Sequence, residues 1–406
     1  MTTEGQRSGR NNDSVRRDNL ATVLGLVHRE RSLSRSQLTL RTGLNRSTVA
    51  ALVSELVERR LVVEAEPTVT RQVGRPSPVV SPDPRTVAVA VNPEIDAIVV
   101  ALVGLGGAVE RRVRVEQSTV PTVETTVDTV ARVVADFVAD GAAPVGVGVA
   151  MPGLVRASDG LVRLAPHLGW TDAPIAELIA AATGLEASAA NDAGLGAKAE
   201  HLFGAGRGMT DLVYLNGGAS GIGGGIIAGG VPVRGVGGFA GEFGHTLATD
   251  RRDRDRTGAP GSLELEVRRS ALLDVLGLPA VEPDVLEHAL VSSTSAEVAA
   301  EIDRQLGYLS LVLRNAVDIL NPQLIVLGGF LASLDAAAPG RLHQLVREQS
   351  LAASFEEVRI ARAELGSDLL LIGAAELAFA RVLADPARVD VSTSSPRTGI
   401  VEPSSS

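Results

Sequence analysis

The polar residues best suited to chemistry lie in the middle of the chain. Asn191 and Asp192 directly follow a segment of small residues that is predicted to be a strand, in the sequence AANDAGLG. In α/β proteins ligands bind beyond the carboxyl ends of strands, so this pair is positioned to contact one. Glu242 and His245 follow in GEFGH, and Glu264 lies in GSLE. Carboxylate, amide and imidazole groups together offer both hydrogen-bond donors and acceptors.

Between these candidates the chain is rich in glycine, with the sequence GIGGG starting at Gly221. The backbone of a glycine loop can approach a phosphate group closely, which makes Gly221, Gly223 and Gly224 candidates for a phosphate loop. Glycines also serve a tight hairpin. The run is therefore weak evidence for a bound nucleotide.

Near the amino terminus, residues 34–64 have the pattern of a helix, a turn that contains glycine, a second helix and a wing. The second helix of such a motif enters the major groove of DNA with its first residues at the base edges. Asn45 is the predicted N-cap. Arg46, Ser47 and Thr48 are the predicted contacts, because arginine can bind guanine and hydroxyls can bind phosphates or base edges. A small structural helix bundle is the alternative.

The predicted wing has two strands with a loop at the tip, and it supplies two further candidates, Arg71 and Arg75. Gly74 and Pro76 flank Arg75 and favour an extended chain that approaches DNA closely. Such an arginine can enter a narrow minor groove. An ordinary role in a linker stays open.

Apolar residues at helical spacing predict three amphipathic helices in the first 60 residues. Ser34 and Gln37 form a capping box at the start of the second helix, which is expected to end at Gly43. The positions expected to be buried in the first and third helices are Leu20, Val23, Leu24, Val27, Val49, Leu52, Val53, Leu56 and Val57.

From residue 86 onward strands and helices alternate, which indicates an α/β fold. Examples are the strands AIVVALV and LIVLGG and the helix EIDRQLGYLSLVLRNAVDIL. We therefore predict a winged helix-turn-helix domain in residues 1–82, an α/β domain in residues 83–388 and a disordered tail, rich in Ser and Pro, in residues 389–406. Pro82 and Pro84 mark the linker.

Charge is distributed unevenly along this division. Residues 1–82 contain 13 Arg and 8 Asp or Glu, whereas the net charge of the whole chain is −10. The first domain is thus basic, with +5, and the rest carries −15. This asymmetry is typical of a nucleic-acid-binding module attached to an acidic body, although uneven surface charge without a partner is the alternative.

The composition excludes several classes of protein. The chain has no cysteine, which rules out disulfides, thiolate nucleophiles and cysteine zinc sites. It has no apolar run long enough to cross a membrane, and its first residues lack the apolar core of a signal peptide. We expect a cytoplasmic protein with no membrane partner.

Several motifs occur in an order that resembles the ROK family of sugar kinases and repressors. They are MPGLV (151–155), LAPHLGW (164–170), AANDAGLGAKAEHLFGAGRG, LNGGASGIGGGIIAGG, RGVGGFAGEFGH and LNPQLIVLGG (320–329). The family body has the actin-like ATPase fold, and the N-terminal helices with VGRP are similar to those of its regulator branch. The resemblance implies double-stranded operator DNA, a sugar effector and a homodimer or homotetramer. It also implies that Asn191, Asp192, Glu242, His245 and Glu264 bind the sugar, with Asp192 at the position of the kinase general base.

Two departures from the family pattern suggest that the chain is not an enzyme. Family kinases begin the body with an Asp-x-Gly-Gly-Thr phosphate turn, whereas Asn92, Glu94, Ile95 and Asp96 stand here. Side chains block the close backbone approach, and added carboxylates repel phosphate, so we expect poor ATP binding and no cofactor.

The second departure concerns a zinc loop. The family zinc is held by the His that matches His245 and by three cysteines, whose positions hold Asp255, Thr257 and Ser262 in this chain. Because closed tetrahedral zinc needs four good ligands, we expect no metal.

The leading hypothesis is therefore a non-enzymatic, sugar-responsive transcription regulator, and we expect a repressor of carbohydrate metabolism. A sugar kinase with an accessory DNA-binding head is one alternative, because Asp192 is present. A constitutive DNA-binding protein whose body only dimerises is another, and the five sugar-contact residues oppose it.

Overall fold

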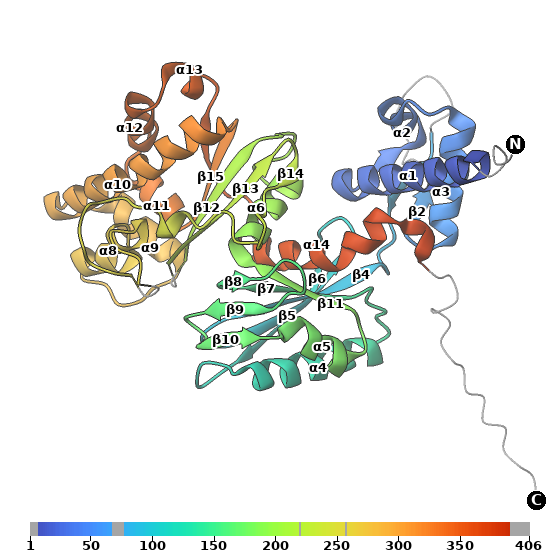
Figure 1. The fold of residues 1–406 in the computed structure, drawn as a ribbon, viewed down its shortest axis with the longest axis horizontal. Helices are drawn as coiled ribbons and strands as arrows, with labels where there is room; N and C mark the ends of the chain where they lie inside the picture. Colours follow the sequence, from blue (N-terminus) through green and yellow to red (C-terminus); the bar gives the residue numbers. More distant parts are fainter. Residues whose placement is uncertain (1–6, 67–76, 219–220, 256–257, 390–406) are drawn as a thin grey trace, which may run out of the picture.

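The chain forms a helical head followed by a body of two lobes, each built around a five-stranded sheet (Figure 1). The structure is a computed structural model that describes residues 7–66, 77–218, 221–255 and 258–389. Within the described residues, no helix has the length and apolar character needed to cross a bilayer.

The head contains three helices and a small antiparallel sheet with the strand order β1-β3-β2. Its elements are α1 (Arg7–Glu30), β1 (Leu33–Ser34), α2 (Arg35–Thr42), α3 (Arg46–Glu58), β2 (Val62–Ala65) and β3 (Val79–Pro82). The two strands of the predicted wing are β2 and β3, which pair antiparallel, and β1 adds a third strand that the sequence did not predict. Buried Leu33 lies in extended backbone just before α2 and pairs with Val80 of β3.

Local capping signals fix the two helices of the helix-turn-helix. Ser34 and Gln37 form both bonds of the predicted capping box, and Gly43 ends α2 in the left-handed conformation with a φ of 69°. Asn45 caps α3 through the backbone N–H of Thr48. The predicted buried residues of α1 and α3 are buried, except Val57, which is 39% exposed. The apolar face of α3 is therefore narrower than predicted.

The first lobe carries a mixed sheet with the order β11-β7-β4-β5-β6. Strands β4, β5 and β6 form an antiparallel meander, whereas β7 and β11 run parallel to β4. Helices α4 and α5 cover one face, and a small sheet of β8, β9 and β10 leads away from β7. The bounds are β4 (Val87–Pro93), β5 (Ala97–Gly104), β6 (Val109–Glu116), α4 (Val123–Ala139), β7 (Val147–Met151), β8 (Leu154–Val155), β9 (Val162–Ala165), β10 (Trp170–Ala173), α5 (Ile175–Thr183) and β11 (Ala187–Asn191).

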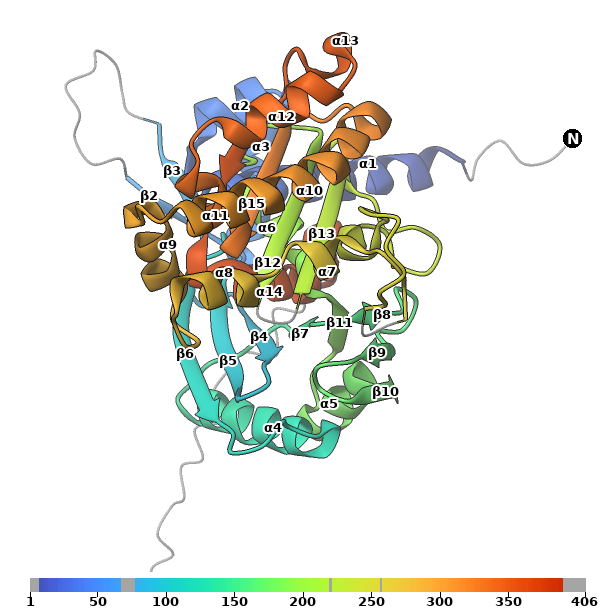
Figure 2. The same cartoon turned by 90° about the vertical axis from the view of Figure 1, so that its left-hand side faces the viewer.

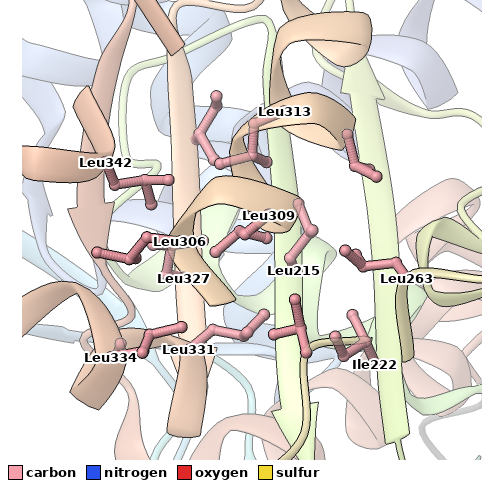
Figure 3. Close-up of a cluster of buried hydrophobic side chains, with 14 of the residues drawn as sticks. Leu215, Ile222, Leu263, Leu306, Leu309, Leu313, Leu327, Leu331, Leu334 and Leu342 are labelled. Carbon is pink, nitrogen blue, oxygen red and sulfur yellow. The ribbon is translucent and has the colours of Figure 1, made fainter. Parts of the chain in front are cut away.

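The second lobe has the sheet order β14-β13-β12-β15-β16. Figure 2 shows α10 lying across this sheet, and Figure 3 shows leucines of α10 and α11 packed on side chains of β12, β13 and β15. Its elements are α6 (Asp192–Phe203), β12 (Leu212–Gly218), β13 (Gly221–Ala228), β14 (Val231–Pro232), η1 (Phe243–His245), α7 (Leu263–Glu266), α8 (Arg269–Leu276), α9 (Pro283–Ser292), α10 (Ala296–Leu320), β15 (Leu324–Gly329), α11 (Phe330–Ala337), α12 (Arg341–Gln349), α13 (Ala352–Phe355), β16 (Arg359–Arg362) and η2 (Gly366–Asp368).

The last long helix, α14 (Leu369–Ala384), returns to the first lobe and packs against β4, β7, β11 and α6. It is followed by η3 (Pro386–Arg388), which contacts α1 of the head. Leu20 and Val23 of the head share one hydrophobic cluster with Ala88 of β4 and Phe379 of α14. Head and body are therefore joined by packing as well as by the short segment 83–86. Of the predicted tail, residues 390–406 lie outside the described part of the chain.

Candidate functional site

A polar pocket lies where the two lobes meet, and all five predicted sugar-contact residues line it. They come from the end of β11 and the start of α6 (Asn191, Asp192), from the segment at η1 (Glu242, His245) and from α7 (Glu264). The candidate glycines Gly221 and Gly223 line the same pocket. The other lining residues are Pro152, Gly153, Pro166, His167, Ala193, Asn216, Gly218 and Ile222.

Asn191 has a structural role at the pocket as well as a predicted ligand role. Its Oδ1 accepts the backbone N–H of Gly194 at 2.9 Å and so caps α6, while its Nδ2 donates to the carbonyl of Gly153 at 3.0 Å. The amide thus fastens the β7–β8 turn to the start of α6. An amide has two N–H donors and two acceptor lone pairs, which leaves one of each for a ligand.

Asp192 is the first residue of α6, and its Oδ1 accepts the backbone N–H of Ala193 at 2.7 Å. Part of the side chain faces the pocket and the rest is enclosed. Burial, aided by the nearby charge of Glu242, raises the pKa of Asp192 to about 7. The carboxyl can therefore exchange a proton close to neutral pH.

His245 lies at the centre of an acidic group. Its Nδ1 is 2.9 Å from Oδ2 of Asp255 and 3.7 Å from Oε1 of Glu264, and its Nε2 is 3.9 Å from Oε2 of Glu242. Burial opposes protonation of the imidazole, but hydrogen bonding to Asp255 and the three carboxylates outweigh it and raise its pKa. Burial in turn raises the pKa of Glu242.

In the loop after η1, hydrogen bonds of Asp255 take the place of bonds from cysteines to a metal. Asp255 is buried, and its Oδ1 accepts the backbone N–H of Ala259 at 2.9 Å while its Oδ2 contacts His245. His245, Asp255 and Glu264 each place one donor atom within 4.8 Å of the others. Three such donors are short of the four that close a structural zinc site, so the residues do not fit the family zinc. Ser262 is buried beside this loop, and Thr257 lies outside the described residues.

The glycine run belongs to strand β13 of the β12–β13 hairpin, which is the alternative that the sequence left open. Gly223 and Gly224 lie inside strand β13, and only Gly221 is at its start. A Cβ on Gly223 would lie 2.7 Å from the Cβ of Ala193 in α6, and one on Gly224 would lie 2.4 Å from the ring of Phe243. These glycines allow α6 and η1 to pack closely on the sheet, so packing alone explains them.

The turn that replaces the first phosphate loop is a tight hairpin between β4 and β5. Asn92 Nδ2 donates to Glu94 Oε1 at 3.0 Å, and Arg114 of β6 forms ion pairs with Glu94 and Asp96. Ile95 is 50% exposed at the tip. Arg114 also pairs with Glu116, so one positive charge faces three carboxylates and the hairpin keeps a net negative charge, as expected. The turn is filled by side chains that already satisfy one another.

Two polar residues that line the pocket were not predicted from the sequence as ligand contacts. His167 lies in the LAPHLGW motif, and Asn216 lies two residues before the end of strand β12. The signal for Asn216 was available, because it is a polar residue at the carboxyl end of an apolar strand. For His167 the signal was its presence in a family motif.

In the head, the predicted base-reading residues form an exposed start of α3. Asn45, Arg46 and Ser47 are exposed, and Thr48 is half-buried. Asn45 Oδ1 accepts both the backbone N–H of Thr48 at 2.8 Å and the hydroxyl of Ser47 at 2.7 Å. Among the described residues, no acidic side chain pairs with Arg46. Arg71 and Arg75 lie outside the described residues.

Four arginines of the head form ion pairs with carboxylates of the head. Arg35 pairs with Glu64 and Arg41 with Glu30, while Arg16 and Arg59 both pair with Glu55. These pairs remove acidic and basic charge together, so the head keeps a net positive charge, and the exposed start of α3 shows where a basic side chain is available to DNA.

The body is actin-like, with two lobes and a polar pocket between them, and it is joined to a winged helix-turn-helix head. These features define a class of protein that combines a sugar-kinase fold with a DNA-binding motif. The ROK family model matches residues 89–381, and the chain belongs to the ROK family. A putative xylose repressor from Caldicellulosiruptor sp. (strain Rt8B.4) is 25% identical over 401 residues, which span 93% of this chain and 99% of that protein. A glucokinase from Halalkalibacterium halodurans is 27% identical but covers 56% of this chain and 74% of the enzyme.

Solved structures show the same fold. A ROK family transcriptional regulator, described as a homologue of the E. coli MLC protein, superposes with a TM-score of 0.76 over 91% of this chain and 97% of its own, at 22% identity. A ROK glucokinase from Streptomyces griseus, solved with glucose and AMPPNP, gives 0.60 over 72% of this chain and 98% of the enzyme, at 23% identity. The regulator likeness extends over the head, whereas the kinase likeness leaves more than a quarter of the chain uncovered.

Proposed function

We propose that this chain is a transcriptional repressor that binds operator DNA through its head and loses or gains DNA affinity when a sugar binds between the lobes. The observation that carries the proposal is the meeting of Asn191, Asp192, Glu242, His245 and Glu264 in one pocket of a body joined to a winged helix-turn-helix. Two xylose repressors among its relatives match along 99% of their own length and make a pentose or hexose the first candidate effector.

We further propose that the body does not transfer phosphate. Phosphoryl transfer depends on backbone groups and cations that hold the phosphates in place. Here the β4–β5 hairpin presents Ile95 at its tip, and the polar groups of Glu94 and Asp96 are taken up by Asn92 and Arg114. A sugar kinase is the second candidate, which Asp192 and the glucokinase relatives favour.

The domain division supports the same scheme. We propose residues 1–82 as the DNA-binding unit and residues 83–388 as the effector-binding and dimerisation unit, with residues 389–406 outside both. Each subunit of a symmetric dimer supplies one recognition helix, so the operator is expected to be a pseudo-palindrome.

The test begins with thermal unfolding of the full chain in D-xylose, D-glucose and their phosphates. A ligand selective for the folded state raises the melting temperature by mass action. Duplexes are then selected from a random pool, and their affinity is measured with and without the stabilising sugar. A sugar that stabilises the protein but leaves DNA affinity unchanged would contradict the proposal. Sugar-dependent consumption of Mg-ATP would instead support the second candidate function, a sugar kinase.

A further inference from the structure

Helix α6 reaches from the sugar pocket to the DNA-binding head. Its first residues, Asp192 and Ala193, line the pocket, and its last residue, Phe203, contacts α1. The Phe203 ring lies edge-on to the His28 ring with 5.2 Å between centroids, and the Arg31 guanidinium lies 5.3 Å from its centre. A helix of 12 residues is about 18 Å long, so one rigid element spans the distance between the two sites.

Three polar side chains, two of them buried, link α6 to the head through α14. Lys198, in the middle of α6, places Nζ 3.2 Å from Oε2 of Glu376 and donates to its backbone carbonyl at the same distance. Oε1 of Glu376 is 2.8 Å from Nε2 of His28 in α1. The side chains of His28 and Glu376 are each only 2% exposed.

Neighbouring groups determine the tautomer of His28 and the ionisation of Glu376. Nδ1 of His28 accepts the backbone N–H of Gly106 at 2.9 Å, so the imidazole proton sits on Nε2 and faces Glu376. Burial alone would raise the pKa of Glu376, but His28 and Lys198 outweigh it and hold that pKa well below its ordinary value. Glu376 is therefore an anion with partners on both sides.

A buried carboxylate with two partners resists sliding. If α6 moved against α14, or α1 against α14, the buried carboxylate of Glu376 would lose a partner, and such a loss is strongly destabilising. A sugar that contacts Asp192 at the start of α6 therefore acts on an element tied to the head. The ligand can select between head arrangements only if it distinguishes the positions of this helix.

We infer that Lys198, Glu376 and His28 are positioning residues that couple the sugar pocket to the helix-turn-helix through α6 and α14. The inference rests on the proposed function, because it assigns the route by which the sugar effect reaches DNA. It predicts that removing the Glu376 charge separates the two binding events while leaving each of them possible.

The experiment compares full-length wild type with Glu376→Gln and with Glu186→Gln as the matched control. Glu186 also pairs with an α14 residue, Arg381, but this pair is exposed, and no ion pair joins either residue to the described part of the head. The affinity for D-xylose, or for whichever sugar stabilises the wild type, is measured with and without saturating selected duplex. The ratio should be about 5- to 150-fold for wild type and Glu186→Gln and should fall below about threefold for Glu376→Gln.

A second readout separates coupling from a merely structural role. Sugar should change the hydrogen-exchange protection of α1 in wild type and in the control but not in Glu376→Gln. If Glu376→Gln does not fold, Phe203→Leu decides, because it weakens the α6 contact with α1 without burying an unpaired charge. A folded variant that keeps the wild-type ratio overturns the inference. If the duplex does not change the sugar affinity of the wild type, the proposed function itself is overturned.

Discussion

At the scale of single residues, Asn191 shows that a cap and a ligand contact need not be alternatives. Its amide holds the start of α6 and the Gly153 turn together, and the same side chain lines the pocket. Replacing it would therefore disturb the geometry of the pocket as well as remove a contact. Cleaner tests of the pocket use residues whose side chains are less involved in the fold.

Asp192 gives a prediction about pH. Its pKa is raised to about 7 by burial, and a sugar hydroxyl that donates to this group favours its ionised form. Sugar binding should then release a proton, and affinity should rise roughly tenfold between pH 6 and pH 8, with most of the rise below pH 7. Calorimetry in buffers of different ionisation enthalpy measures both quantities. Asp192→Asn should abolish the rise. An unchanged rise in that variant would assign the proton to His245.

Asp255 gives a second prediction, because it orients His245 where the family has a metal ligand. Asp255→Asn removes the charge that faces Nδ1 and should lower the pKa of His245, which proton NMR of the imidazole would measure. We expect sugar affinity to fall by at least about tenfold, in line with the roughly 1.5–3 kcal/mol of a hydrogen bond to a charged group. Asp253→Asn, an exposed change in the same loop, should leave both quantities as in wild type.

At the scale of elements, features with a local cause could be predicted from the sequence. Ser34, Gly43 and Asn45 act through hydrogen bonds within a few residues, and the structure confirms all three caps. The pocket residues could be predicted because their motifs follow the family order. The contact of Arg114 with the β4–β5 hairpin and the contact of His28 with Glu376 could not be predicted, since their partners are distant in sequence and follow no periodic pattern.

The recognition helix α3 supplies a prediction for DNA. Arg46 is exposed at its start, and a bidentate contact with guanine is worth about 1–3 kcal/mol at one base position. Arg46→Ala should therefore relax specificity at one position of each half-site, as measured by binding to a set of single-base operator variants. Arg132→Ala, which removes an exposed charge from α4 in the body, is the control. Equal weakening on every sequence would show that Arg46 contacts phosphate only.

At the scale of the whole molecule, the two binding events must influence each other equally. If sugar weakens operator binding by some factor, operator DNA must weaken sugar binding by the same factor. Glu242→Ala removes a pocket acceptor and leaves the head untouched. We expect this variant to bind operator with wild-type affinity in the absence of sugar and to lose its response to sugar, as measured by fluorescence anisotropy. A normal response would place the effector site elsewhere.

The return of α14 to the head has a consequence for synthesis. The helices of the head leave the ribosome first, but Phe379, which shares their hydrophobic cluster, leaves among the last residues. At roughly 5–20 residues per second, the head waits about 15–60 s before Leu369 and the rest of α14 are made. During that time the recognition helix is complete and the body cannot yet influence it. A nascent or prematurely ended chain would therefore present a single head whose contact with one half-site does not respond to sugar, and without the dimerisation unit it could not hold both half-sites at once.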